Sequence, residues 1–153
     1  MNNTGFWIIV GSPENFERTR ALGFTVQGLK SRHRKKAEMM KPGDKFAYYL
    51  TGRKAFAAIA TVISGYRAEH DRIWASGDPA RADEDYPFRL DIEPDVVLDP
   101  DEYIDAEPIA RQMDYASKWP AANWTLAFQG NVHSISETDF GLIEAAMKVA
   151  AHG

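Results

Sequence analysis

Short runs of apolar and β-branched residues recur along the chain, each closed by Gly, Pro, Asn or Asp, and they predict a β-rich core. The expected strands are residues 6–10, 24–26, 45–50, 55–64, 86–92, 124–128 and 131–135. Residues 6–10 are apolar throughout, which is typical of a central strand buried on both faces. Side chains alternate along residues 45–50, so Tyr48 and Tyr49 should point to opposite faces of the sheet.

Boundary signals predict a helix directly after the first strand. Ser12 is a good N-cap residue, and Pro13 fits the first helical position. Gly23 readily adopts the left-handed conformation that ends a helix, so this helix should stop at Leu22. Shorter helical segments are expected at residues 37–40 and 108–116.

The C-terminal helix carries the strongest of these signals. Ser136 and Asp139 fit a capping box, and Ile135 with Phe140 fits a hydrophobic staple. The elements then follow the order strand, helix, strands, helix, strands, helix. This order predicts one α+β domain over residues 1–153, in which helices pack on a mixed sheet or small barrel.

Composition excludes several classes of protein. Hydrophobic residues make up 44% of the chain, which is enough for a core and excludes a disordered or fibrous chain. Because cysteine is absent, there is no disulfide, thiolate nucleophile or Cys-ligated metal. The longest mostly apolar run, residues 55–63, is too short to cross a membrane, and no signal-peptide pattern precedes the first strand. We therefore expect a cytoplasmic protein.

The net charge of −4 conceals a strong asymmetry. Residues 1–74 hold 13 Lys and Arg against 6 Asp and Glu, whereas residues 75–153 hold 5 against 16. Six of the seven residues from Lys30 to Lys36 can carry a positive charge. Such a run can be a solvated surface, but aromatic residues nearby in sequence favour nucleic acid, whose bases stack on rings while Lys and Arg bind its phosphates. The expected phosphate contacts are Lys30, Arg32, Arg34, Lys35 and Lys36.

No catalytic or metal site is predicted. The chain lacks a Gly-x-Ser-x-Gly elbow and a Gly-rich phosphate loop, and none of its four His lies beside both a nucleophile and an orienting carboxylate. The spaced acids Asp99, Asp101 and Asp105 resemble a calcium loop only superficially. Tyr103 and Ile104 stand where such a loop needs a ligand and its turn glycine. We expect no enzyme, cofactor or metal.

Trp74 stands out because it lies in a polar segment, residues 65–86, that has no regular apolar period. A segment of this length in a compact domain is usually functional or mobile. The indole either covers the edge of the sheet or lines a pocket, where it would be partly exposed. The residues around it leave both possibilities open.

Nine stretches form an ordered set along the chain: Phe6–Val10, Ser12–Asn15, Gly23–Phe24, Lys41–Asp44, Tyr48–Tyr49, Tyr66–Arg67, Arg72–Trp74, Tyr86–Leu90 and Ser136–Phe140. Together they resemble the EVE domain family, which belongs to the PUA-like group together with YTH domains. The resemblance covers nearly the whole chain, and the order of the stretches is more specific than any one of them.

The resemblance implies the PUA-like fold, a mixed β-barrel with surrounding helices in a single domain. Members of the group bind nucleic acid, and YTH domains hold a methylated adenine in an aromatic cage. By the same resemblance, this chain is expected to read a modified base of DNA or RNA in a similar pocket, without catalysis. Two alternatives stay open: an RNA-binding module without modified-base specificity, and a small-molecule or nucleotide enzyme that uses the same pocket.

Carried over position by position, the resemblance implies a base pocket made by Ser12, Asn15, Phe24, Thr25, Val26, Tyr48, Tyr49, Trp74 and Arg89. Ser12 and Asn15 would supply polar contacts to the base, and Trp74 would be the cage tryptophan. Arg89 would hold the pocket or touch a phosphate.

Two features of this pocket stay open. YTH domains have a tryptophan at the first wall, where this chain has Phe24 or Thr25, so the identity of the base is not implied. The sequence also does not decide whether Tyr48 or Tyr49 faces the pocket.

Overall fold

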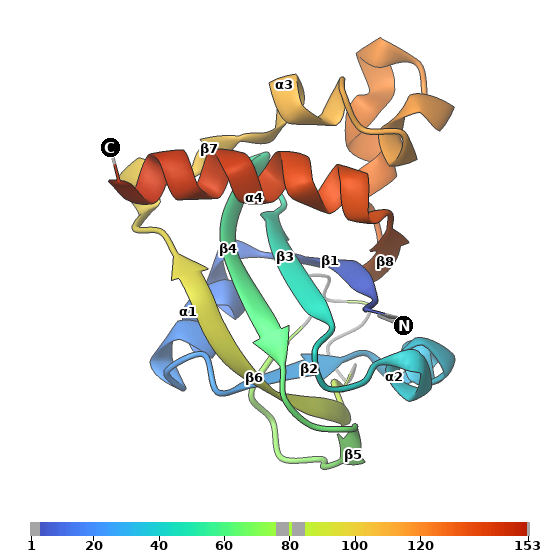
Figure 1. Ribbon diagram of the computed structural model, residues 1–153. Coiled ribbons are helices and arrows are strands. Elements are labelled where there is room, and N and C mark those ends of the chain that lie inside the picture. The colour runs from blue at the N-terminus through green and yellow to red at the C-terminus, as the bar shows by residue number, and fades with distance from the viewer. Residues whose placement is uncertain (1–3, 76–79, 81–84, 153) are drawn as a thin grey trace.

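A curled sheet organises the fold, with helices packed on its outer face and against its concave side (Figure 1). The computed structural model describes residues 4–75, 80 and 85–152, so residues 76–79 and 81–84 of the polar segment lie outside the described part. The strands are β1 (Phe6–Gly11), β2 (Val26–Leu29), β3 (Lys45–Leu50), β4 (Ala55–Val62), β5 (Arg67–Ala68), β6 (Phe88–Val97), β7 (Ile104–Asp105) and β8 (Val132–Ile135).

Helices connect and cover these strands. The α-helices are α1 (Pro13–Ala21), α2 (Arg34–Met39), α3 (Ala106–Ala110) and α4 (Glu137–His152). The 3-10 helices are η1 (Ser31–His33), η3 (Pro100–Glu102), η4 (Tyr115–Lys118) and η5 (Ala121–Phe128). No helix within the described residues has the length and apolar character that a membrane crossing needs.

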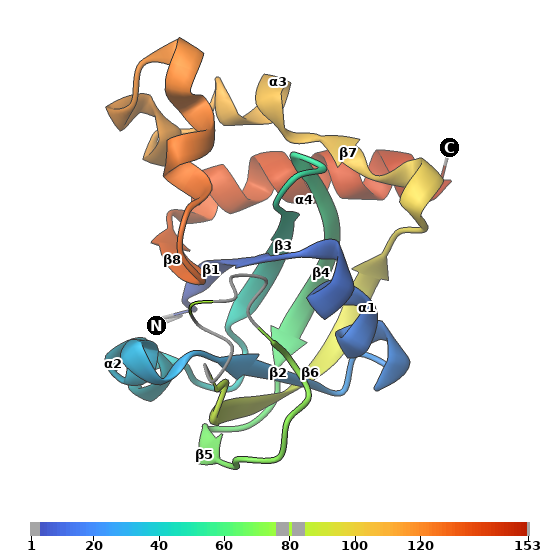
Figure 2. The same ribbon diagram turned by 180° about the vertical axis from the view of Figure 1, so that it is seen from behind.

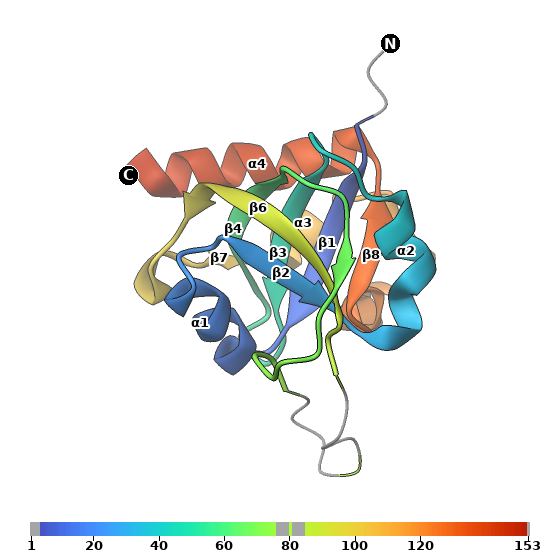
Figure 3. The same cartoon turned by 90° about the horizontal axis from the view of Figure 1, so that it is seen from below.

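The sheet is mixed. Its strands follow the order β2-β6-β4-β3-β1-β8, with β5 beside β6 and β7 beside β4. β1 and β3 run parallel, and the other strand pairs of the described residues are antiparallel. The sheet curls into a half-barrel, seen from below in Figure 3, and within the described strand order its end strands β2 and β8 do not pair with each other. The predicted α+β fold with a mixed, barrel-like sheet is confirmed.

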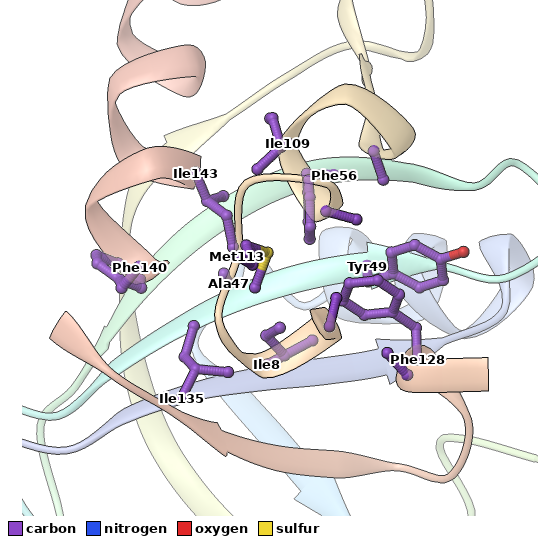
Figure 4. Packing of buried hydrophobic residues seen from close by; sticks show 14 of the residues in the cluster. Ile8, Ala47, Tyr49, Phe56, Ile109, Met113, Phe128, Ile135, Phe140 and Ile143 are labelled. Carbon is purple, nitrogen blue, oxygen red and sulfur yellow. The ribbon is translucent and has the colours of Figure 1, made fainter. Parts of the chain in front are cut away.

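The outer face of the sheet carries one half of the core. Ile8, Ala47 and Phe56 lie on this face, where residues of α4 and η5 cover them (Figure 4). Tyr49 stacks on Phe128 of η5 with the ring centroids 4.4 Å apart. Each fully buried side chain of this size stabilises the fold by about 1.5–3 kcal/mol.

The concave inner face carries the other half. Trp7 and Ile9 of β1 alternate with the outward residues and join Phe46 and Tyr48 of β3 in a second cluster, which α1 completes with Phe16. β1 is apolar throughout because both of its faces are covered, as its sequence predicts. The prediction that neighbouring tyrosines on β3 point to opposite faces is also confirmed.

Asn131 bridges the gap between the end strands of the half-barrel. Its carbonyl oxygen accepts a hydrogen bond from the Val10 amide at 2.8 Å, and its Oδ1 accepts one from the Lys30 amide at 3.0 Å. Its Nδ2 donates to the Val10 carbonyl at 3.4 Å. One residue further on, the Val132 carbonyl accepts a hydrogen bond from Lys36 Nζ at 2.8 Å. The segment after β2 is therefore fixed against β1 and β8 by polar contacts.

The predicted signals at α1 are confirmed. Ser12 Oγ accepts a hydrogen bond from the Asn15 amide at 3.1 Å, and Pro13 occupies the first turn. The helix ends at Ala21, with Leu22 as its C-cap and Gly23 beyond it at a φ of +73°. This placement matters because α1 borders the cavity described below.

Several local predictions are wrong. Of the strand expected at residues 24–26 only Val26 lies in β2, because Phe24 turns the chain with a φ of +54°. The helix expected at residues 108–116 ends at Ala110 in α3, and η4 begins only at Tyr115.

Residues 124–128 do not form a strand but belong to η5, in which Trp124, Ala127 and Phe128 recur at helical spacing and pack into the core. The capping box of α4 is only half formed, because Asp139 donates its amide to Ser136 Oγ but directs its carboxylate elsewhere. That carboxylate accepts hydrogen bonds from the amides of Asp114 and Tyr115 at the start of η4.

Candidate nucleic-acid interface

A narrow cavity, called the inner cavity below, lies between α1 and the concave face of the sheet. It is lined by Ile9, Val10, Gly11, Asn15, Phe16, Thr19, Gln27, Tyr48, Leu50, Trp74, Tyr86 and Asn131. Its volume is about 20 Å³, which is room for about one water molecule. A whole base does not fit into this space.

A wider depression, the outer hollow, adjoins the inner cavity. It has a volume of about 240 Å³ and is lined by Val10, Gly11, Ser12, Asn15, Lys30, Thr51, Ala75, Tyr86 and Gly130. The two spaces share Val10, Gly11, Asn15 and Tyr86. The arrangement is therefore a hollow open to solvent with a small recess behind it.

Trp74 lines the inner cavity and is only 3% exposed. Its Nε1 donates a hydrogen bond to Thr19 Oγ1 at 2.9 Å, and the Arg89 guanidinium lies 5.3 Å from the ring centroid. The sequence left open whether the indole covers the edge of the sheet or lines a pocket. It does both, because it packs on β2 and lines the inner cavity. The partial exposure expected of a pocket-lining tryptophan is not observed, because the ring packs directly on the sheet.

Gly28 makes this packing possible. A β-carbon at Gly28 would lie 2.5 Å from Cζ3 and 2.7 Å from Cε3 of Trp74, and 3.0 Å from the Tyr86 carbonyl oxygen. These distances are shorter than any ordinary carbon contact, so only a glycine lets the indole approach the backbone so closely.

A buried polar chain forms the floor of the inner cavity. Tyr48 donates its hydroxyl proton to Gln27 Oε1 at 2.8 Å, and Gln27 Nε2 donates to the Gly28 carbonyl at 2.9 Å. Thr19 lies 3.4 Å from the same Gln27 oxygen and accepts the indole N–H. Burial raises the pKa of Tyr48 well above its usual value of 10, so this hydroxyl stays neutral and remains a donor.

The structure decides between the two tyrosines of β3. Tyr48 lines the inner cavity, whereas Tyr49 lies on the outer face against Phe128. Burial raises the pKa of Tyr49 to about 12.

Asn15 anchors the segment that carries the tryptophan. Its Nδ2 donates to the Ala75 carbonyl at 2.8 Å, and its Oδ1 accepts from the Ala75 amide at 3.0 Å. Ser12 fixes the start of the same helix and lines the outer hollow. The polar groups of Asn15 are thus used to position Ala75 beside Trp74.

Arg89 is 2% exposed and acts within the same segment. Its Nε donates to the Tyr86 carbonyl at 3.2 Å, and its guanidinium donates to both the side chain and the carbonyl of Asp71. Of the two roles expected for Arg89, this burial favours holding the pocket over touching a phosphate. A guanidinium also binds such paired oxygens more specifically than a lysine would.

Five expected pocket residues lie outside the linings of both spaces: Tyr49 and Arg89, described above, and Phe24, Thr25 and Val26. Phe24 is buried against Phe16, with the ring centroids 5.2 Å apart, and has a φ of +54°. Thr25 is exposed and donates its hydroxyl proton to the Leu22 carbonyl at 2.7 Å. Val26 begins β2. Phe24 thus belongs to the core cluster that contains Phe16 and Tyr48, two residues that line the inner cavity.

The expected phosphate contacts fall into two groups. Lys30 lines the outer hollow, with its Nζ 5.8 Å from the Tyr86 ring centroid, and Lys36 is half-buried against β8. Burial lowers the pKa of Lys36. The exposed members are Arg32, Arg34 and Lys35. Arg34 also forms an ion pair with Glu38 at 3.3 Å.

Several residues of the site have weak signals in the sequence. Thr19 lies one helical turn after Asn15 on α1, a spacing that could have placed both on one face. Gln27, Tyr86 and Asn131 come from separate elements, and only the folded chain brings them together.

Within the described residues, one group of exposed acids at η3 has its carboxylates close together. Those of Asp99, Asp101 and Glu102 lie within 4.8 Å of one another. Asp99 and Glu102 form a capping box across η3, which accounts for this arrangement without an ion.

Comparison with known proteins gives the following similarities. The sequence model of the EVE domain matches residues 5–146. No functionally curated protein sequence matches the chain.

Solved structures share the fold. The YTH domain of the Zygosaccharomyces rouxii MRB1 protein, in complex with N6-methyladenosine RNA, is 14% identical with a TM-score of 0.64, covering 98% of this chain and 88% of that one. The YTH domain of mmi1 in complex with RNA is 10% identical with a TM-score of 0.66, covering 96% and 83%. A Rhodopseudomonas palustris protein is 15% identical with a TM-score of 0.59, covering 95% and 94%.

The close approach of Trp74 to Gly28 leads to a stability prediction. Gly28→Ala should lower the free energy of unfolding by about 1–3 kcal/mol, because the new methyl group overpacks the indole. The matched variant is Gly65→Ala, since a β-carbon at Gly65 meets nothing within 4 Å, and it should change stability by at most about 0.5 kcal/mol. Urea unfolding of both variants measures the difference. Equal stabilities would contradict the packing described.

A second prediction concerns His33 in η1. Burial, followed by the charges of Lys36, Arg32 and Lys30, lowers the pKa of His33 to about 4 from the usual 6.5. Between these values the unfolded chain binds a proton that the folded chain does not. The contribution of His33 to stability is therefore fully present above pH 6.5 and is lost as the pH falls toward 4.

The substitution His33→Gln removes this titration. The variant should lose less free energy of unfolding than the wild type when urea unfolding at about pH 7 and at about pH 5 is compared. An identical loss in both proteins would mean that the histidine is not held neutral by its surroundings.

Proposed function

The chain belongs to the EVE domain family, and on that premise we propose that it is a non-catalytic nucleic-acid-binding module that takes one base into the outer hollow. An extruded base needs apolar or aromatic surfaces for its faces and fixed polar groups for its edge. The lining of the outer hollow includes Tyr86, Ser12, Thr51 and Lys30. This combination of an aromatic ring, hydroxyls and a cation in one open hollow is the observation that carries the proposal.

A modified base fits the shape of the site better than an unmodified one. The inner cavity behind the hollow has the size of one small group, and apolar side chains such as Ile9, Phe16 and Leu50 form much of its lining. A base in the outer hollow would direct a methyl substituent into this recess. Burying one such group is worth about 0.8 kcal/mol, or about a fourfold gain in affinity.

The similar structures support the same interpretation. One was solved with N6-methyladenosine RNA and another with RNA, and both are folded like this chain. RNA carrying a methylated base is therefore the first ligand to test, with DNA of the same sequence beside it. A module that binds RNA without regard to modification would use the outer hollow alone.

A filled hollow tests the base-binding proposal. A β-carbon at Gly11 meets nothing within 4 Å, and Gly11 lines both spaces, so Gly11→Leu should occupy the hollow without straining the fold. We expect this variant to lose most of its affinity for oligonucleotides with N6-methylated or unmodified adenine, measured by fluorescence anisotropy. The matched variant Gly65→Leu should bind like the wild type. Full binding by Gly11→Leu with an unchanged thermal midpoint would place the base elsewhere.

The salt dependence of affinity tests the proposed phosphate contacts of residues 30–36, called the basic run below. Lys35→Glu on α2 and Lys148→Glu on α4 reverse the same charge on two exposed helices. Only the first should reduce the slope of log affinity against log salt, by about 0.7–0.9 for each phosphate that the variant no longer neutralises. Equal slopes for both variants would make the basic run a solvated surface.

A further inference from the structure

Three neighbouring rings, those of Tyr115, Trp119 and His133, form an aromatic surface at η4 and β8, called the flanking patch below. Tyr115 and Trp119 lie on and beside η4, with their ring centroids 5.7 Å apart, and the Tyr115 and His133 rings are 5.6 Å apart. All three side chains are partly exposed. Aromatic side chains that keep part of their surface in water can accept a further ring.

The flanking patch is continuous with the outer hollow. Gly130 lines the hollow, and a β-carbon at Gly130 would lie 3.7 Å from the ring of His133. His133 in turn contacts Tyr115. A strand of nucleic acid leaving the hollow past Gly130 would therefore meet the patch directly.

The basic run faces the same flank of the molecule. Figures 1 and 2 show α2, β8 and the η4–η5 segment following one another along it, and Lys36 Nζ bonds to the Val132 carbonyl of β8 at 2.8 Å. The lowered pKa of His33 reflects burial first, then the charges of Lys36, Arg32 and Lys30, with His133 contributing as well. These groups are thus close enough to one another to act on a single imidazole.

A cation also borders the far end of the patch. Lys118 Nζ lies 6.0 Å from the ring centroid of Tyr115. The patch is consequently framed by positive charge on the α2 side and at η4. Aromatic faces interleaved with cations suit a polyanion that carries flat rings, which is the chemistry of single-stranded nucleic acid.

Hydrogen bonds to η4 hold the patch in place. The Asp139 carboxylate, only 2% exposed, accepts hydrogen bonds from the amides of Asp114 at 3.0 Å and Tyr115 at 2.9 Å. The Tyr115 hydroxyl donates to the Ala127 carbonyl at 2.9 Å. Because these bonds fix the Tyr115 ring in the free protein, it loses little conformational entropy when a base stacks on it.

We propose that the flanking patch is a second base-binding subsite, on which a nucleotide neighbouring the one in the outer hollow stacks against Trp119 or Tyr115. The proposal rests on the proposed function, since the first base fixes the direction of the strand. The proposal gives a role to the segment between α3 and α4. Of this segment, only Gly130 lines the outer hollow. The ligand class is single-stranded RNA or DNA extending beyond one base.

A ladder of oligonucleotides tests the subsite. The probes are single-stranded RNAs of one, three, five and seven nucleotides, each with the same central N6-methyladenine, and the same ladder in DNA. For the wild type we expect affinity to rise with length by roughly tenfold or more when the patch becomes occupied, since one stacked base contributes that much. The RNA and DNA ladders show which sugar the strand carries.

Paired variants separate stacking from folding. Trp119→Leu keeps an apolar side chain but removes the flat ring, so it should abolish the gain with length while binding the shortest probe like the wild type. Trp119→Phe keeps an aromatic ring at this position, so it should retain part of the rise in affinity with oligonucleotide length. The thermal midpoints of both variants show whether either substitution destabilises the fold. Tyr115→Leu removes the neighbouring ring as an independent test of stacking.

The outcomes distinguish this subsite from the proposed function. A gain with length that survives in both Trp119→Leu and Tyr115→Leu overturns the subsite but not the hollow. If Gly11→Leu binds normally while Trp119→Leu abolishes the gain, the base in the hollow is refuted, and the patch binds a base without the neighbour that the proposal assigns to it. If no probe of either ladder binds the wild type, both proposals are refuted.

Discussion

The structure depends on how the gap between the end strands of the half-barrel is bridged. Unpaired strand edges expose main-chain donors and acceptors, and native proteins must cover or satisfy them. Asn131 does so for Val10 and Lys30 together, which an asparagine can do because its amide carries both a donor and an acceptor. The same contacts position Lys30 at the lining of the outer hollow. The closure of the fold and the shape of the site therefore share one residue.

The packing of Trp74 on Gly28 sets the depth of the site. The indole N–H is taken up by Thr19, and the hydroxyl of Tyr48 by Gln27, so these polar groups around the inner cavity already have partners inside the protein. A ligand that competed for them would leave a buried group unpaired, at a cost of about 1–3 kcal/mol. Under the proposed function, the recess would therefore take an apolar substituent, and the polar contacts to the base would come from the outer hollow.

The sequence predicts those parts of the molecule that local signals determine. Ser12 and the glycine after α1 mark a helix whose ends are confirmed, and alternation along β3 correctly separates Tyr48 from Tyr49. Segment 124–128 is mistaken for a strand because a short apolar run fits helix and strand equally well. The role of Arg89 depends on Asp71, 18 residues away, and no periodicity reveals a pairing at that separation. The sequence predicts the chemistry of each residue and its local structure, but not which distant segments meet in the folded chain.

A net charge of −4 does not oppose the binding of a polyanion, because screening makes the interaction local. At physiological ionic strength charges act over about 8 Å, so the residues around α2 decide the field that a phosphate meets there. Burial is the first cause of the lowered pKa of His33, and the charges of Lys36, Arg32 and Lys30 lower it further, so these cations lie close to one imidazole. A phosphate at this place would relieve their mutual repulsion. The same positive charges that disfavour a protonated His33 in the free protein would attract the phosphates of a nucleic acid.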